Sequence, residues 1–175
     1  MFSRIEIKNY KSIRDANINL HGINILIGPN NSGKSNFLDF FAFYQSIFFM
    51  GVKDAFGPRP FQFRDVIFKG SDYWNNDIAG KFIYRSSKNK EIEHFFSIGN
   101  SVSTPKIFNL QVLKETLKLN NDNNVKVFNN ENIFSINKLA SKNVCLDDYV
   151  RGCRSIKKYQ FSPKDIKKDG MIILE

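Results

Sequence analysis

The sequence predicts an α/β fold in which strands surround a phosphate-binding loop and one buried helix, with an antiparallel β lobe attached. Three observations favour this fold. Residues 23–27 form a nearly continuous apolar run that ends at Gly28, as expected of a strand covered on both faces. Apolar residues then recur at helical spacing from Ser35 to about Phe49. Short alternating runs separated by polar clusters occupy residues 78–137.

The N-terminal segment predicts two half-buried strands joined by a tight connection. Ile5 and Ile7 alternate with polar neighbours, and Ile18 and Leu20 alternate with asparagines. This period of two places the apolar side chains on one face of a sheet. The helix after the loop is apolar almost all round, so we expect it to be deeply buried and to end at Gly51.

The chain beyond that helix predicts a β lobe and then a short tail. Two prolines and a glycine mark a loop at residues 57–60. A polar turn between the runs at 78–84 and 91–98 predicts a hairpin. Further strands are expected at 108–119, 125–128 and 133–136, then a helix over 147–156 and a strand at 158–161. We therefore divide the chain into a phosphate-loop core (1–56), a mostly β lobe (57–140) and a segment with a helix, a strand and a basic tail (141–175).

A phosphate-binding motif lies between the apolar run and the helix. Its spacing, G-x-x-x-x-G-K-[ST], places several backbone N–H groups around one point, where the positive end of the helix dipole also favours a phosphate. Lys34 should put its ammonium between the β- and γ-phosphates, and the Ser35 hydroxyl should coordinate Mg²⁺. The sequence therefore predicts a site for ATP and Mg²⁺ made by Gly28, Pro29, Asn30, Asn31, Ser32, Gly33, Lys34 and Ser35.

Composition argues against several other kinds of protein and site. No apolar run approaches the roughly 20 residues that cross a bilayer, and the N-terminus lacks the apolar core of a signal peptide, which predicts a cytoplasmic protein. Two cysteines and two histidines signal neither a disulfide framework nor a zinc site. The net charge of +9 permits an anionic partner such as DNA, but a solvated lysine-rich surface near the C-terminus is the commoner explanation.

The opening of the chain and the phosphate loop together resemble a known family. Residues 5–13 (IEIKNYKSI), followed by a strand and GPNNSGKSN, are similar to the start of the SMC/RecF-like branch of ABC-type ATPases, and most similar to AAA-type ATPases related to the OLD family. In this family two ATPase heads sandwich two ATP molecules between a phosphate loop and a signature loop. The resemblance implies a P-loop NTPase half-domain, and it implies that Lys11 and Ser12 border the nucleotide. A plain turn between two strands explains these two residues equally well.

The sequence departs from this family where catalysis is concerned. No segment resembles the Leu-Ser-Gly-Gly-like signature loop. Residues 144–148 and 171–175 imitate the Walker B strand, but the first has too short an apolar run and the second offers Glu175 in place of aspartate. The catalytic glutamate is unassigned, and Gln62 and Gln160 are available as sensors of the γ-phosphate. Because phosphoryl transfer needs a positioned water and charges that meet the transition state, we expect little ATPase activity from this chain alone.

Three interpretations follow from the motif and the resemblance. The first is the ATP-binding N-terminal half of an SMC/RecF-like ATPase, truncated or split. Its partners would be a second head or a separate C-terminal half, with DNA or a nuclease or toxin, in DNA repair, mobile elements or phage defence. The second is a non-catalytic ATP-binding module that docks on a full-length ATPase through an exposed sheet edge. The third is a P-loop kinase or GTPase, although Asn137 and Lys138 open a GTPase base-reading motif that lacks its aspartate.

Overall fold

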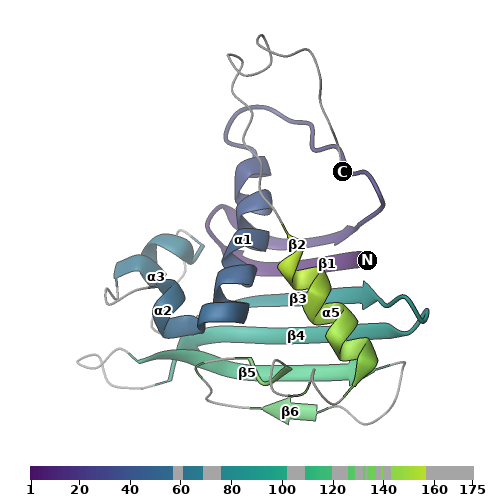
Figure 1. Ribbon diagram of the computed structural model, residues 1–175. Coiled ribbons are helices and arrows are strands. Elements are labelled where there is room, and N and C mark those ends of the chain that lie inside the picture. Colours follow the sequence, from purple (N-terminus) through teal and green to yellow (C-terminus); the bar gives the residue numbers. More distant parts are fainter. Residues whose placement is uncertain are drawn as a thin grey trace, which may run out of the picture.

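The computed structural model describes residues 1–56, 61–68, 76–101, 109–119, 126–128, 132, 134–136, 139 and 143–156. The strands are β1 (Phe2–Tyr10), β2 (Ile13–Asn19), β3 (Ile78–Arg85), β4 (Glu91–Asn100), β5 (Leu110–Leu119) and β6 (Lys126–Phe128). They form one six-stranded sheet in the order β2-β1-β3-β4-β5-β6 (Figure 1). The predicted mixture of helices and strands is confirmed, and every pair of neighbouring strands in this sheet is antiparallel.

The first hairpin, β1 with β2, forms where the alternating pattern predicts it. Ile5 and Ile7 of β1 are fully buried, whereas Glu6 lies on the opposite face in an ion pair with Lys81 at 3.2 Å. The tight connection after β1 places Lys11 at φ 48°, a left-handed conformation that lysine rarely adopts. Such a conformation persists only where the surrounding structure holds it.

β3 and β4 form the predicted second hairpin, and β5 and β6 fall within the predicted runs. The turn between β3 and β4 is closed by a hydrogen bond from the Ser86 N–H to the Lys90 carbonyl at 2.9 Å. Asn89 takes a φ of 55° in this turn, a conformation that asparagine tolerates. Because β3 also pairs with β1, strands from the predicted phosphate-loop core and from the predicted β lobe belong to one continuous sheet.

The helices cover one face of this sheet (Figure 1). They are α1 (Lys34–Met50), α2 (Val52–Phe56), α3 (Phe61–Val66) and α5 (Val144–Arg154). The end of α1 is the predicted one, because Gly51 at φ 86° donates its N–H to the Ile47 carbonyl at 3.0 Å. Among the described residues, no helix has both the length and the apolar character to cross a bilayer.

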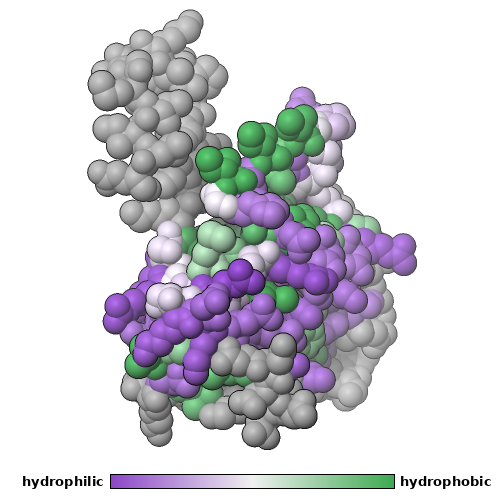
Figure 2. All heavy atoms as spheres, turned by 90° about the vertical axis from the view of Figure 1, so that its right-hand side faces the viewer, coloured by the Kyte–Doolittle hydropathy of each residue, from purple (hydrophilic) through white to green (hydrophobic). Residues whose placement is uncertain are grey.

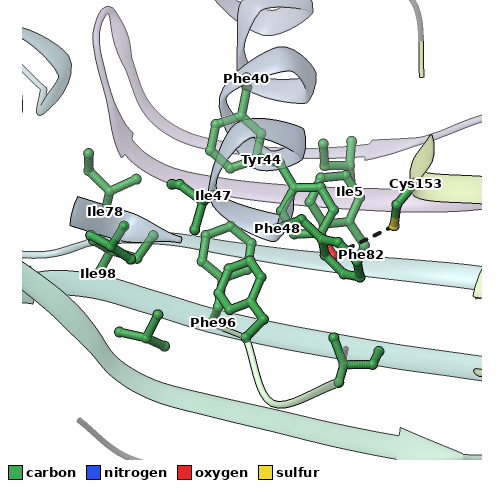
Figure 3. Close-up of a cluster of buried hydrophobic side chains, with 14 of the residues drawn as sticks. Ile5, Phe40, Tyr44, Ile47, Phe48, Ile78, Phe82, Phe96, Ile98 and Cys153 are labelled. Atoms are coloured by element: carbon green, nitrogen blue, oxygen red, sulfur yellow. Dashed lines mark hydrogen bonds between the residues drawn. The ribbon is translucent and has the colours of Figure 1, made fainter. Parts of the chain in front are cut away.

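The core is built by aromatic side chains of α1 that lie against the sheet. Phe40 and Tyr44 point toward Phe82 of β3 and Phe96 of β4 (Figure 3). The ring centroids of Tyr44 and Phe82 are 4.1 Å apart, and those of Tyr44 and Phe96 are 5.3 Å apart. Fully burying a side chain of this size stabilises the fold by about 1.5–3 kcal/mol. Leu38, however, is 50% exposed, so α1 is buried on one side and not all round as predicted.

A polar network is enclosed between α1, α5 and the sheet. His94 of β4 hydrogen-bonds through Nδ1 with the hydroxyls of Tyr44 (2.8 Å) and Tyr149 (3.1 Å), and through Nε2 with Glu115 (3.0 Å). All four side chains are fully buried. Burial raises the pKa of both tyrosines, so their hydroxyls stay protonated and available as donors.

The predicted strand at residues 23–27 is wrong. Ile23, Ile25 and Ile27 are 83%, 79% and 90% exposed, and the segment belongs to no strand. A strand needs a neighbour for its backbone N–H and C=O groups, and no segment among the described residues pairs with this one. In the space-filling view, apolar side chains gather at the top of the molecule (Figure 2).

The predicted strand at 133–136 is also wrong in its described part, residues 134–136, which belong to no strand: Ser135 lies in a turn and Ile136 is helical. The backbone N–H groups of Ser135 and Ile136 donate to the Glu115 carboxylate at 2.6 and 3.2 Å. These two N–H groups are therefore occupied by a side chain and cannot join a strand ladder.

The C-terminal helix α5 begins earlier than predicted. Asn143 caps it, since its side chain accepts the N–H of Cys145 at 2.9 Å, whereas Asp147 lies inside the helix and pairs with Arg151 at 2.7 Å. Residues 144–148 are consequently helical and are not a Walker B strand. The predictions at 57–60, 158–161 and 171–175, including Gln160 and Glu175, lie outside the described residues.

Candidate nucleotide site

The phosphate loop leads directly into α1. Gly33, at φ 94° and ψ 0°, immediately precedes the first helical residue. A Cβ on Gly33 would lie 3.2 Å from the Ser12 Oγ, so both the left-handed backbone and the close approach of Ser12 favour glycine. No side chain caps α1 and no acidic residue lies in its first turn. Its positive end is therefore directed at the loop without a side-chain carboxylate to offset it.

The ammonium group of Lys34 lies inside the loop. It donates to the backbone carbonyls of Gly28 at 2.7 Å and Pro29 at 2.6 Å, and it lies 3.2 Å from the Ser32 Oγ. Neutral oxygens thus surround the cation at the place where the motif expects phosphate oxygens. A phosphate oxygen carries a full negative charge, which attracts the ammonium more strongly than a carbonyl dipole does, so a phosphate would compete effectively for this ammonium.

An open pocket of about 610 Å³ lies over the loop, within the size range of small-ligand sites. Seven of the ten predicted site residues line this pocket. Two more, Gly28 and Pro29, are joined to it because their carbonyls accept hydrogen bonds from the Lys34 ammonium. The pocket is lined by Ser12, Asn30, Asn31, Ser32, Gly33, Lys34, Ser35 and Asn36. The loop residues and Ser12, predicted from separate parts of the sequence, therefore form one cavity.

Lys11, the remaining predicted residue, lines a neighbouring pocket of about 490 Å³. This second pocket is lined by Lys11, Ser12, Asn36, Asp65 and Phe68, so it shares Ser12 and Asn36 with the first. Asn36, Asp65 and Phe68 were not predicted as site residues. Asn36 could have been predicted as a site residue, because it directly follows the phosphate loop in the sequence. Nothing in the sequence places Asp65 and Phe68 beside Ser12.

Ser35 is the one metal ligand that the motif predicts. Within the part of the chain that the structure describes, no group of three or more His, Cys, Asp or Glu residues could hold a metal ion. Magnesium commonly keeps several waters and takes its remaining ligands from a carboxylate or hydroxyl and from substrate phosphates. A single exposed hydroxyl beside a phosphate loop fits Mg²⁺ that arrives with a triphosphate.

Comparisons with known proteins identify several relatives. The chain is 34% identical over 91 residues to the chromosome partition protein Smc of Thermoplasma acidophilum, a match that covers 51% of this chain and 7% of that protein. Among solved structures, an SMC ATPase described by its ATP-driven dimerization and DNA-stimulated activation has 18% identity and a TM-score of 0.46, over 98% of this chain and 92% of that one. The recombination mediator protein RecF with ATP has 16% identity and a TM-score of 0.43, over 89% of this chain and 39% of that one.

One family match extends over nearly the whole chain. The AAA ATPase domain matches residues 1–169, which include the phosphate loop, Lys11 and Ser12. The chain spans only a small part of Smc, so the activity and partners of that whole protein do not transfer with the match. The resemblance that residues 5–13 and the phosphate loop indicate is confirmed at the level of the family. This chain therefore belongs to the AAA ATPase domain family.

Proposed function

We propose that this chain binds ATP together with Mg²⁺ in the pocket over residues 28–35. The supporting observation is that Gly33, the uncapped start of α1 and the Lys34 ammonium surround a single pocket. Backbone N–H groups at a helix start and a lysine ammonium are the donors that a polyphosphate tail takes up. Ser35 would hold the Mg²⁺, which would neutralise charge on the phosphate oxygens.

The test is a Lys34→Ala variant, titrated with Mg-ATP by isothermal calorimetry. We expect wild-type protein to bind and the variant to lose at least about tenfold in affinity, since a charge-assisted hydrogen bond contributes about 1.5–3 kcal/mol. Lys53→Ala is the matched control, because Lys53 lies exposed on α2 and is remote from the loop in sequence. Binding by Lys34→Ala as tight as that of the wild type would contradict the proposal.

We further propose that the chain works in the cytoplasm with a second ATPase head or a separate C-terminal half that supplies the signature and Walker B elements. The supporting observation is the exposed apolar segment at 23–27, which finds no pairing strand among the described residues. A related SMC ATPase is described as dimerizing with ATP. On this proposal the chain is the N-terminal part of an OLD-related ATPase that acts on DNA or with a nuclease or toxin, in repair, mobile elements or phage defence.

A non-catalytic module that docks on a full-length ATPase is the second candidate, because the same exposed segment would serve as its docking surface. Sedimentation velocity with and without Mg-ATP distinguishes the two. An ATP-dependent dimer of this chain supports a second head. A stoichiometric complex with a full-length ATPase from the same organism supports the module. A chain that stays monomeric with Mg-ATP and forms no complex with a separately encoded C-terminal half or with a full-length ATPase contradicts both.

A further inference from the structure

Lys11 lies beside a pocket that shares two lining residues, Ser12 and Asn36, with the pocket over the phosphate loop. It lines the second pocket directly, and its chain neighbour Ser12 lines both. A lysine ammonium on a four-carbon stem is a mobile point charge unless other groups hold it. The affinity of the first pocket for an anionic ligand therefore depends on what holds this side chain.

The backbone of Lys11 is fixed by hydrogen bonds to the segment around α3. Its N–H donates to the Val66 carbonyl at 2.6 Å, and the Phe68 N–H donates back to the Asn9 carbonyl at 2.9 Å. These two bonds lie on either side of the turn and hold Lys11 in its left-handed conformation. The backbone position from which the Lys11 side chain extends is thus fixed before any ligand binds.

The side chain of Lys11 is held by Asp39 of α1. The Asp39 carboxylate accepts hydrogen bonds from the Lys11 ammonium and from the Tyr10 hydroxyl, the latter at 2.8 Å. The lysine and aspartate side chains are 32% and 30% exposed, so the pair is partly shielded from water. The Lys11 ammonium also lies 5.5 Å from the centre of the Tyr10 ring, where a cation is attracted to the aromatic face.

Tyr10 is itself buried and packed against α1, and its hydroxyl holds the Asp39 carboxylate in turn. Its ring is 1% exposed and packs on Phe40 with a centroid distance of 4.9 Å. Burial first, and then the hydrogen bond and the charge of Asp39, raise the pKa of Tyr10, so its hydroxyl remains a donor to the carboxylate. Asp39 follows Ser35 by four residues and therefore lies on the same side of α1, one turn further along.

We propose that Asp39 is a positioning residue of the nucleotide site, which holds the Lys11 ammonium beside the second pocket so that a bound nucleotide meets a fixed cation. This inference rests on the proposed binding of Mg-ATP. Helix α1 then carries both Lys34, at its first residue, and Asp39, the anchor of the second cation. The two positive groups, Lys34 and Lys11, keep a constant spacing because one rigid helix sets both.

The direction of the effect of removing Asp39 follows from two opposing contributions. The carboxylate repels a phosphate, but it lies about 6 Å below Ser35 along the helix axis. At a separation of about 10 Å in water at physiological salt, this repulsion lowers affinity only about 1.2-fold per phosphate charge. A released lysine must instead be immobilised again on binding, which lowers affinity by up to about tenfold. Positioning is therefore the larger contribution.

The experiment measures Mg-ATP affinity by calorimetry for Asp39→Asn, Lys11→Ala and the double variant. We expect Asp39→Asn to bind about threefold to tenfold more weakly than the wild type. In the Lys11→Ala background the same substitution should have no further effect, because the group through which Asp39 acts is gone. Asp15→Asn is the matched control: its carboxylate also pairs with a lysine, Lys8 at 3.7 Å, but lies exposed on β2, and its affinity should equal that of the wild type.

Unchanged or tighter binding by Asp39→Asn would overturn the inference, and so would an equal loss with and without Lys11. If Asp39→Asn does not fold, Tyr10→Phe serves instead, since it removes one hydrogen bond to the carboxylate. Tyr10→Phe should lower the affinity for Mg-ATP when Lys11 is present and leave it unchanged in the Lys11→Ala background. A loss of the same size in both backgrounds would refute the positioning role of Asp39. A wild-type protein that shows no binding of Mg-ATP refutes the proposed function itself, whereas tight wild-type binding with an unaffected Asp39→Asn refutes this inference alone.

Discussion

The Glu115 carboxylate is fully buried, and its negative charge is compensated by His94 and by two backbone N–H groups. Burial acts to raise the pKa of Glu115, but the hydrogen bond and charge of His94 and two backbone N–H groups outweigh it, and the pKa is lowered. The carboxylate is consequently ionised in the folded chain. A buried charge that loses its partners destabilises a protein strongly, so this pair ties β4 and β5 to the segment at residues 135–136.

The free energy of unfolding should therefore decrease as the solution is made acidic. Since the pKa of Glu115 is lower in the folded than in the unfolded state, its contribution is complete above the ordinary glutamate pKa of about 4.3 and is lost as the pH falls through the folded-state pKa. We expect Glu115→Gln to lower the free energy of unfolding by about 3 kcal/mol at neutral pH and to flatten this acid-side slope. Denaturant unfolding between pH 7 and about pH 3 measures both quantities.

Glu93→Gln is the matched control for that measurement. Glu93 lies on the neighbouring strand β4, next to His94 but on the opposite face of the sheet, in a partly exposed ion pair with Lys81 at 3.8 Å. Partly exposed pairs contribute about 0–1 kcal/mol. An acid-side slope that is the same in Glu115→Gln and in the wild type would show that another group carries the pH dependence.

At the scale of elements, helix α5 is fastened at both ends by single polar side chains. Asn143 accepts the Cys145 N–H at its start. At its end, the Gln45 side-chain amide of α1 donates to the carbonyls of Cys153 and Ile156, both at 3.0 Å. The last carbonyls of a helix lack partners within the helix, so Gln45 supplies a donor that also joins α5 to the helix of the phosphate loop.

Loss of the Asn143 cap should loosen α5 without disturbing the sheet. We expect Asn143→Ala to lower the free energy of unfolding by about 1 kcal/mol, because one N–H of the first turn loses its acceptor. Asn143→Ser retains an acceptor at this position and should stay within a few tenths of a kcal/mol of the wild type. Chemical denaturation followed by circular dichroism measures both, and equal stability of the alanine and wild-type proteins would contradict the capping role.

The elements that the sequence predicts well are those whose signal is local. The alternation in β1 to β5 and the Gly51 stop of α1 depend on residues close in sequence, and they appear where predicted. The strand at 23–27 was not predictable from its own residues, since a strand also depends on a partner elsewhere. The turn at Ser135 is held by the Glu115 carboxylate, which lies 20 residues away in the sequence.

The same distinction applies to the candidate site. The motif spacing places Gly33, Lys34 and Ser35 correctly at the start of a helix. Asp39, however, becomes part of the site only because β1 lies beside α1 and brings Tyr10 to it. Residues that meet from different elements leave no spacing pattern in one sequence, so this group of contacts required the fold.

At the scale of the whole molecule, one sheet separates a buried face from a charged one. Helices cover the face that carries Ile5, Phe82 and Phe96, while Glu6 and Lys81 form ion pairs on the other face. The exposed isoleucines at 23–27 do not fit this division, because they are apolar side chains outside the core. Single exposed apolar residues are common in proteins, but a run of them in one segment is not.

These isoleucines should contribute nothing to the stability of the chain by itself. Replacing Ile23, Ile25 and Ile27 together by threonine should keep the free energy of unfolding within about 0.5 kcal/mol of the wild type, since surface changes rarely exceed that value. Binding of a hydrophobic dye such as ANS should decrease, because apolar surface is removed. By contrast, Ile5→Thr at a fully buried position should destabilise by about 3 kcal/mol, as it leaves a cavity and buries a hydroxyl. A loss of stability in the triple variant as large as that of Ile5→Thr would mean that the segment packs against the core, and the apolar run would then need no outside partner.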